Sequence, residues 1–167
     1  MATDQWKIRL VSQSDNQLLA QVLRDVLIEM NAPEEGTAYA DSELNAIYDA
    51  YLQDNADYWV VCHGDHILGG AGIAPLRDGP SGYCELQKMY FLPDARGKGL
   101  GNLIIQKCLT HAKSFGYIYC YLETMPNMID AQMLYKKWGF TYIDHPLGNT
   151  GHYSCRVWMV KSLRDDD

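Results

Sequence analysis

The segment Arg96-Gly97-Lys98-Gly99-Leu100-Gly101 holds the residue types and spacing that most clearly indicate chemistry in this chain. It follows an apolar, strand-like run over 84–92 and opens a helical pattern that continues to Phe115. Glycines let the main chain approach an anion closely, and the free N–H groups of a first helical turn point at it. Arg96 and Lys98 add positive charge. The segment therefore predicts a phosphate-binding turn that holds a phosphorylated cofactor.

Other interpretations of the glycines fit the residues less well. A Rossmann dinucleotide site needs a third glycine where this chain has Ile104, and residues 93–96 separate the strand from the glycines. Glu123, at the end of the next predicted strand, would match the ribose-binding acid of such a site. A Walker P-loop is excluded because no Gly-Lys-Ser/Thr occurs at the required spacing. A glycine-rich turn without a ligand stays open.

Two motifs resemble those of the GNAT family of N-acetyltransferases. Arg96-x-x-Gly99-x-Gly101, after the strand-like segment 85–93, closely resembles the acetyl-CoA-binding motif of that family. Further downstream, Ala131-x-x-x-Tyr135-x-x-x-Gly139-Phe140 resembles its second motif. The resemblance implies an α/β (α+β) acyl-CoA N-acyltransferase fold, with a mixed, mostly antiparallel sheet of six to seven strands flanked by about four helices.

The resemblance also implies acetyl-CoA as co-substrate, without a metal. The pantetheine arm would pair with the exposed backbone of a splayed strand around 89–91, as a peptide adds to a sheet edge. The pyrophosphate would bind the glycine turn. Met128 stands where the family often has Asn, and Asn127 lies one residue off, about 100° around a helix. The implied cofactor-binding residues are Met89, Tyr90, Phe91, Arg96, Gly97, Lys98, Gly99, Leu100, Gly101, Asn102, Asn127 and Tyr135.

Acetyl transfer from a thioester needs a neutral amine, a stabilised oxyanion and a proton for the departing thiolate. The resemblance implies Tyr135 as the general acid and the backbone N–H near Met89 as the oxyanion donor. Glu85 is the candidate base, since strand alternation places it on the same face as Met89 and Phe91. Two alternatives stay open: Tyr135 only packs on its neighbours, and Glu85 is a solvated glutamate of an edge strand.

The histidines and cysteines give no metal-binding pattern. The five histidines lack the spacing of zinc ligands. The five cysteines form no CxxC pair and lie in apolar segments, as reduced core thiols of a cytosolic protein do. His145 and His152 are candidate auxiliary bases, with surface or hydrogen-bonding roles as the alternative. Cys155, on the predicted last strand, is expected in the core. The alternative is a nucleophile that carries the acetyl group, which the resemblance disfavours because direct transfer is usual in the family.

Charge is distributed unevenly along the chain. A net charge of −7 argues against general nucleic-acid binding, which needs a basic surface. Residues 1–85 hold 4 Lys and Arg against 14 Asp and Glu, whereas residues 88–137 hold 7 against 3. The basic segment suits an anionic cofactor. The acidic first half either suits a cationic amine or merely solvates helix surfaces.

Length and composition predict one domain, assigned to 1–164, with a frayed tail at 165–167. The N-terminus lacks the features of a signal peptide, and no apolar run is long enough to span a bilayer. We therefore expect a cytoplasmic protein that contacts neither membrane nor nucleic acid. The family resemblance is consistent with a homodimer.

The predicted elements follow the order β-α-α-β-β-β-α-β-α-β-β. Ser14 with Gln17 predicts the capping box of the first helix, which extends to about residue 30. A second helix is predicted over 42–51, and the last strand over 152–160. The glycine turn then lies at the carboxyl end of a strand, where open α/β sheets usually bind ligands.

Together these patterns predict an N-acetyltransferase that moves the acetyl group of acetyl-CoA directly to a primary amine of a small molecule or peptide. One alternative is a non-catalytic sensor that binds acyl-CoA. Another is an acyltransferase that uses a different acyl-CoA or a hydroxyl acceptor. Loops 31–42 and 145–156 are expected to select the acceptor, because loops set specificity on a shared scaffold.

Overall fold

Seven strands form one mixed sheet in the computed structural model, which describes residues 5–166. The spatial order is β1-β2-β3-β4-β5-β7-β6, and only β4 and β5 run parallel. This confirms the predicted fold class. Residues 1–4 of the expected domain and Asp167 of the expected tail lie outside the described residues. The strands are β1 Trp6–Leu10, β2 Asp57–His63, β3 His66–Pro75, β4 Tyr83–Phe91, β5 Tyr119–Thr124, β6 Thr141–Ile143 and β7 Val157–Ser162.

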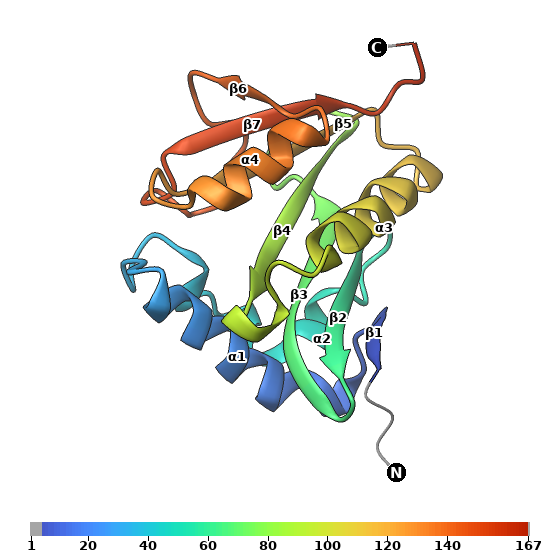
Figure 1. Cartoon of the computed structure of the whole chain (residues 1–167). Helices are drawn as coiled ribbons and strands as arrows, with labels where there is room; N and C mark the ends of the chain where they lie inside the picture. The colour runs from blue at the N-terminus through green and yellow to red at the C-terminus, as the bar shows by residue number, and fades with distance from the viewer. Residues whose placement is uncertain (1–4, 167) are drawn as a thin grey trace.

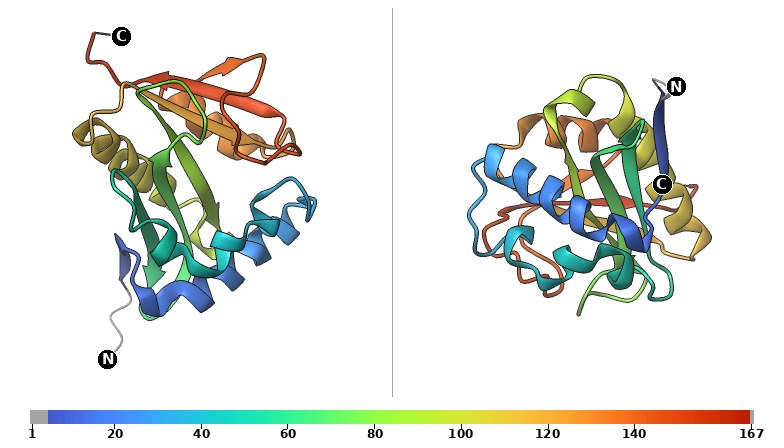
Figure 2. Two further views of the ribbon diagram at one scale, coloured as in Figure 1. Left: turned by 180° about the vertical axis from the view of Figure 1, so that it is seen from behind. Right: turned by 90° about the horizontal axis from the view of Figure 1, so that it is seen from below.

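Four α-helices cover the two faces of the sheet (Figures 1 and 2). They are α1 Asn16–Glu29, α2 Ile47–Ala50, α3 Leu100–Ser114 and α4 Ile129–Lys137. On one face Leu23 of α1 packs in a core with Val60, and on the other Ile104 of α3 packs in a core with Val61. Alternate residues of β2 thus enter opposite cores, as the pleat of a strand requires.

The first helix begins differently from the prediction. The predicted capping box of Ser14 and Gln17 is wrong, because a short 3-10 turn precedes α1 and its box is formed by Ser12 and Asp15. The Ser12 amide donates to Asp15 Oδ2 at 2.8 Å. Asp15 is buried and also pairs with Arg9 of β1 at 2.7 Å. The sequence pattern of a capping box does not include such a contact with a strand.

Two other elements differ from their predicted bounds. The helix predicted over 42–51 is mainly a 3-10 segment, Ser42–Ala46, followed by the single turn of α2. The last strand begins at Val157 rather than 152. Residues before it form a loop in which Gly148 and Gly151 adopt left-handed conformations, with φ of 66° and 79°.

A bulge interrupts β4. Gly70 pairs with Tyr90 but Gly72 pairs with Gln87, so β4 has one extra residue between these pairs. Lys88 in the bulge has a φ of 49°, which few non-glycine residues adopt. Because side chains alternate along a strand, one extra residue exchanges the faces of all residues beyond it.

The bulge corrects one expectation about Glu85. Met89 and Phe91 pack against the core under α3, as Leu86 does. Glu85 alternates with Leu86 and pairs with Ala74, which belongs to the core on the other face. The prediction that Glu85 shares a face with Met89 and Phe91 is therefore wrong.

β4 separates from β5 after a short parallel contact. The two strands pair only from Tyr83 with Tyr119 to Glu85 with Tyr121. Figure 1 shows β4 continuing toward α1, while β5 diverges with β6, β7 and α4. The splayed strand expected around 89–91 is therefore present.

Candidate functional site

A groove of about 410 Å³, here called the front groove, lies between the ends of α1 and β4 and the starts of α3 and α4. Every predicted cofactor-binding residue except Lys98 lines it. The lining residues that were predicted are Met89, Tyr90, Phe91, Arg96, Gly97, Gly99, Leu100, Gly101, Asn102, Asn127 and Tyr135. The fold thus gathers segments that are distant in sequence into one groove.

The glycine turn presents free amides to the front groove. Gly97 and Gly99 have φ of 71° and 76°, and Gly99 is the N-cap of α3. The amide of Leu103 donates to Gly99 O at 3.3 Å, which is the first hydrogen bond of the helix. The amides of residues 100–102 come before it and therefore have no acceptor within the helix. A Cβ on Gly101 would lie 3.0 Å from Leu134 Cδ2, within the groove wall. This geometry fits an anion such as a pyrophosphate.

Two of the predicted residues also brace the groove walls. The Arg96 guanidinium makes a bidentate ion pair with Glu29 at the end of α1, with distances of 2.8 and 2.6 Å. Asn127 Nδ2 donates to Met30 O at 2.8 Å, which ties the start of α4 to the end of α1. Arg96 therefore positions α1, and its positive charge beside the groove is paired with the Glu29 carboxylate.

Lys98 and Asn102 have partners outside the groove. The Lys98 ammonium lies 5.7 Å from the centroid of the Trp6 ring, and Lys98 does not line the groove. Asn102 Oδ1 accepts a hydrogen bond from Trp138 Nε1 at 3.0 Å. Because its oxygen is engaged, Asn102 is oriented to offer its Nδ2 donor to an anion at the helix start.

Tyr135 lines both the front groove and a smaller inner pocket behind it. The side chain is buried and packs against Phe140 in the core that lies under α3. Its hydroxyl has no hydrogen-bond partner among residues 5–166, although buried tyrosines usually find one. Burial raises the pKa of Tyr135, so the hydroxyl keeps its proton at neutral pH. The residue can therefore donate a proton or a hydrogen bond to a bound molecule.

A second pocket of about 410 Å³, here called the rear pocket, lies on the other side of β4. The inner pocket adjoins both regions, since Met89 and Tyr135 also line the front groove and Lys88 also lines the rear pocket. The side chains that line the rear pocket include Asp41, Glu43, Arg77, Glu85, Gln87, Lys88, Thr150 and His152.

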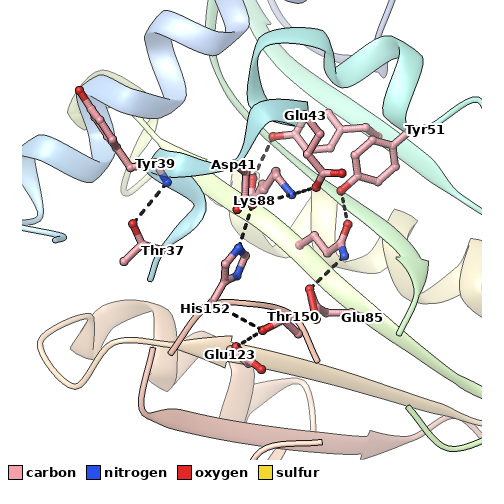
Figure 3. Close-up of polar contacts among 12 residues, drawn as sticks. Thr37, Tyr39, Asp41, Glu43, Tyr51, Glu85, Lys88, Glu123, Thr150 and His152 are labelled. Carbon is pink, nitrogen blue, oxygen red and sulfur yellow. Dashed lines mark hydrogen bonds and ion pairs between the residues drawn. The ribbon is translucent and has the colours of Figure 1, made fainter. Parts of the chain in front are cut away.

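Glu85 is a buried carboxyl with one free oxygen. Its side chain accepts from Gln87 Nε2 at 3.0 Å through Oε1, and Gln87 is in turn held by the Tyr51 hydroxyl (Figure 3). Oε2 has no partner among the described residues. Burial, and then the charge of Glu123, raise the pKa of Glu85 to about 7. Glu85 can therefore exchange a proton near neutral pH.

Four charged residues of the rear pocket form a network that the sequence did not reveal. Lys88, whose side chain is 2% exposed, pairs with Glu43 and lies 3.6 Å from Asp41. His152 Nε2 lies 2.8 Å from Asp41 Oδ2 (Figure 3). Burial lowers the pKa of His152, but Asp41 raises it more, and the net shift is upward. In the sequence, only the excess of acidic residues over 1–85 indicated this network.

Glu123 lies beside Glu85 at the inner pocket. It accepts from the Tyr121 hydroxyl at 2.7 Å and from Thr150 Oγ1 at 2.8 Å. Its interpretation as a ribose-binding acid is wrong, because the sheet is not a Rossmann sheet. His145 is exposed and contacts Asp144, so of the two candidate auxiliary bases only His152 lines the rear pocket.

Replacing Lys88 with methionine is expected to lower the free energy of unfolding by about 1–2 kcal/mol. The loss is limited because Asp41 and Glu43, with side chains 24% and 47% exposed, can be hydrated when unpaired. Chemical denaturation measures it. Lys113→Met is the control, because its pair with the 90% exposed Asp165 is screened by solvent and is expected to contribute little to stability. Equal effects of both substitutions would contradict a structural role for Lys88.

Neither a metal centre nor a membrane span is found within residues 5–166. No group of three or more His, Cys, Asp or Glu side chains is arranged there to hold a metal ion. In the same range, no helix combines the length and apolar character that crossing a bilayer requires. The five cysteines are free and buried, Cys155 among them.

Comparison with known proteins agrees with this geometry. The model of the acetyltransferase (GNAT) family matches residues 24–140. The uncharacterized N-acetyltransferase YjgM of Escherichia coli K12 is 41% identical over 157 residues, which cover 93% of this chain and 94% of YjgM.

Solved structures share the fold at low sequence identity. A GNAT acetyltransferase from Staphylococcus aureus Mu50 has a TM-score of 0.83 at 20% identity, covering 96% of this chain and all of the other. YncA from Salmonella typhimurium, solved with acetyl-CoA, has a TM-score of 0.74 at 16% identity and covers 96% of this chain and 95% of its own. With the family model and a relative of nearly full length in agreement, this chain belongs to the GNAT family and is an acyltransferase.

Proposed function

We propose that this protein transfers the acetyl group of acetyl-CoA directly to a primary amine of a small molecule or peptide. One observation carries the proposal. The front groove, with its glycine amides, and the rear pocket, with its acidic side chains, lie on either side of the inner pocket, beside the gap between β4 and β5. Tyr135 lies on the groove side of this gap and Glu85 on the pocket side.

In this proposal the front groove binds acetyl-CoA and the rear pocket binds the amine. The amides of 100–102 and the Asn102 side chain bind the pyrophosphate, and the unpaired backbone of β4 pairs with the pantetheine arm. Acetyl-CoA, when bound, supplies an acetyl group activated as a thioester. The backbone N–H near Met89, in the bulged part of β4, donates to the carbonyl oxygen as negative charge develops there.

Two side chains move the protons. Glu85 Oε2 accepts a proton from the incoming ammonium, directly or through a water, so that a neutral amine attacks. Tyr135 donates its hydroxyl proton to the departing thiolate of coenzyme A. Unused hydrogen-bonding capacity supports these roles. Glu85 Oε2 is a buried oxygen without a partner among the described residues, and the Tyr135 hydroxyl forms no hydrogen bond within residues 5–166. A cytoplasmic location and a homodimer stay predictions from the sequence.

Thiol release with a panel of primary amines tests the proposal. We expect coenzyme A thiol to appear only when enzyme, acetyl-CoA and an amine are all present. Binding of acetyl-CoA without turnover on any acceptor would contradict the proposal and favour a sensor. Faster turnover with longer acyl-CoA donors, or with hydroxyl acceptors, would instead identify a different acyltransferase.

Tyr135→Phe is expected to lower kcat by about tenfold or more, because only the proton donor is removed. The Kd for acetyl-CoA and the Tm are expected to stay close to those of the parent, since the hydroxyl has no partner within residues 5–166. Steady-state kinetics and calorimetry measure these quantities. Tyr142→Phe is the matched control, because Tyr142 lies on β6 and its hydroxyl donates to Gln132. An unchanged kcat in Tyr135→Phe would rule out the acid role.

A further inference from the structure

The rear pocket contains equal numbers of acidic and basic residues, but not all of them are paired. The acids are Asp41, Glu43 and Glu85, and the bases are Arg77, Lys88 and His152. Lys88 pairs with Glu43, and His152 with Asp41. These four side chains are engaged with one another, which leaves one acid and one base without an ion-pair partner among the described residues.

The acid that remains is Glu85. Its residue is only 5% exposed, and its Oε2 lacks a partner among the described residues. Glu123, with Thr150 and Tyr121 as its partners, adds further negative character next to it. A buried carboxylate without its full set of hydrogen bonds is costly, and an ammonium group would supply both the charge and the donors.

The base that remains is Arg77, at the rim of the pocket. Its guanidinium forms no hydrogen bond or ion pair with any residue in 5–166, including its neighbour Asp78. The main chain at this position is fixed, because Asn149 N donates to Arg77 O at 2.8 Å. A Cβ on Gly148 would lie 2.4 Å from the same oxygen, so the loop packs tightly there. A guanidinium on a fixed backbone suits a carboxylate, which it can bind through two parallel hydrogen bonds.

We propose that the acceptor is a small amino carboxylate, whose primary amine faces Glu85 and whose carboxylate faces Arg77. The inference rests on the proposed function, because it names the class of amine that the rear pocket accepts. A diamine fits less well, since the carboxylates available for its second ammonium, Asp41 and Glu43, are already paired. A volume of about 410 Å³ lies in the range of pockets for small molecules.

Matched acceptors test this proposal through initial rates at saturating acetyl-CoA. The set consists of the L-amino acids, their carboxamides, their decarboxylated amines, and putrescine as a diamine. We expect kcat/KM for the best amino acid to exceed that for its own carboxamide and its own decarboxylated amine by about 30-fold or more. Because the three share a side chain and differ only at the carboxylate, the ratio isolates that group.

Arg77 variants assign the effect to the arginine. Arg77→Gln is expected to raise KM for the preferred amino acid about tenfold or more and to leave the rate with its carboxamide unchanged. Arg77→Lys is expected to restore part of the preference by restoring the charge. Lys107→Gln, which removes an exposed positive charge on α3, is expected to change neither rate, and circular dichroism verifies that each variant folds.

The outcomes separate this inference from the proposed function. Equal or better turnover of carboxamides, monoamines or putrescine would overturn the amino carboxylate proposal and leave N-acetyl transfer intact. An equal effect of Arg77→Gln on the acid and its carboxamide would also overturn it. Absence of turnover with every acceptor would overturn both.

Discussion

Gly101→Asp is expected to weaken acetyl-CoA binding by about 100-fold or more, which corresponds to about 2.7 kcal/mol. The new Cβ would lie 3.0 Å from Leu134 Cδ2 and 3.7 Å from Met89 Cε, between the groove walls. Its carboxylate would lie in the first turn of α3, where the pyrophosphate is proposed to bind. Repulsion between the like charges adds to the loss of space.

The fold is expected to tolerate this change. Gly101 does not have the positive φ of Gly97 and Gly99, and an acid in the first turn is favourable to a helix. Isothermal titration with acetyl-CoA measures the Kd, and thermal unfolding measures stability. Gly101→Asn separates volume from charge, and we expect it to weaken binding by only about tenfold. A Kd for Gly101→Asp within threefold of the parent would contradict the assignment of the groove.

Glu85→Gln is expected to reduce kcat/KM by about 100-fold at pH 8 and to remove its rise with pH. The parent rate should rise as Glu85 ionises, with an inflection set by its raised pKa of about 7. Glutamine keeps the size and the hydrogen bond to Gln87 but cannot accept the proton. Asp65→Asn, an exposed change in the turn between β2 and β3, is expected to leave the profile intact. If Glu85→Gln also left it intact, another base or none would be needed.

The same substitution is expected to stabilise the protein at alkaline pH. The pKa of Glu85 rises from 4.5 to about 7 on folding, so the folded state holds its proton more tightly than the unfolded state does. The free energy of unfolding therefore falls as pH rises from about 4.5 to about 7, by up to about 3 kcal/mol. Glu85→Gln removes this loss.

Denaturation of both proteins at pH 5 and pH 8 measures this difference. We expect Glu85→Gln to be more stable than the parent by about 2–3 kcal/mol at pH 8, and by much less at pH 5. A gain in stability together with a loss of activity would show that the buried carboxyl is retained for function. Equal stability at both pH values would mean that Glu85 is not desolvated as its burial indicates.

Local patterns sufficed to predict most of the fold and the front groove. The glycines at 97, 99 and 101 and the strand before them are contiguous, and their spacing alone predicts free amides at a helix start. A second contiguous motif singled out Tyr135, which lines this groove. Alternating apolar residues located the strands, because the pleat gives each strand a period of two that is visible in sequence.

Long-range contacts and backbone irregularities could not be predicted in this way. The bulge at Lys88 depends on how β4 pairs with β3, and it placed Glu85 on the face opposite to the one predicted. The pairs of Lys88 with Glu43 and of His152 with Asp41 join residues 45 and 111 positions apart. Sequence patterns relate residues only a few positions apart. The residues of the rear pocket could therefore be identified as neighbours only from the structure.

Direct transfer of the acetyl group from acetyl-CoA to the amine is tested most directly by one mass-spectrometric experiment. Enzyme, acetyl-CoA and the most reactive amine are mixed at equal concentrations. Mass spectrometry then determines the masses of the intact protein and of the amine, and a thiol reagent determines the concentration of free coenzyme A thiol. Direct transfer predicts one acetyl group on the amine for each thiol released, and none on the protein, including Cys155. Acetyl-CoA that stays intact, or an acetyl group that remains on the protein, would contradict direct transfer to the amine.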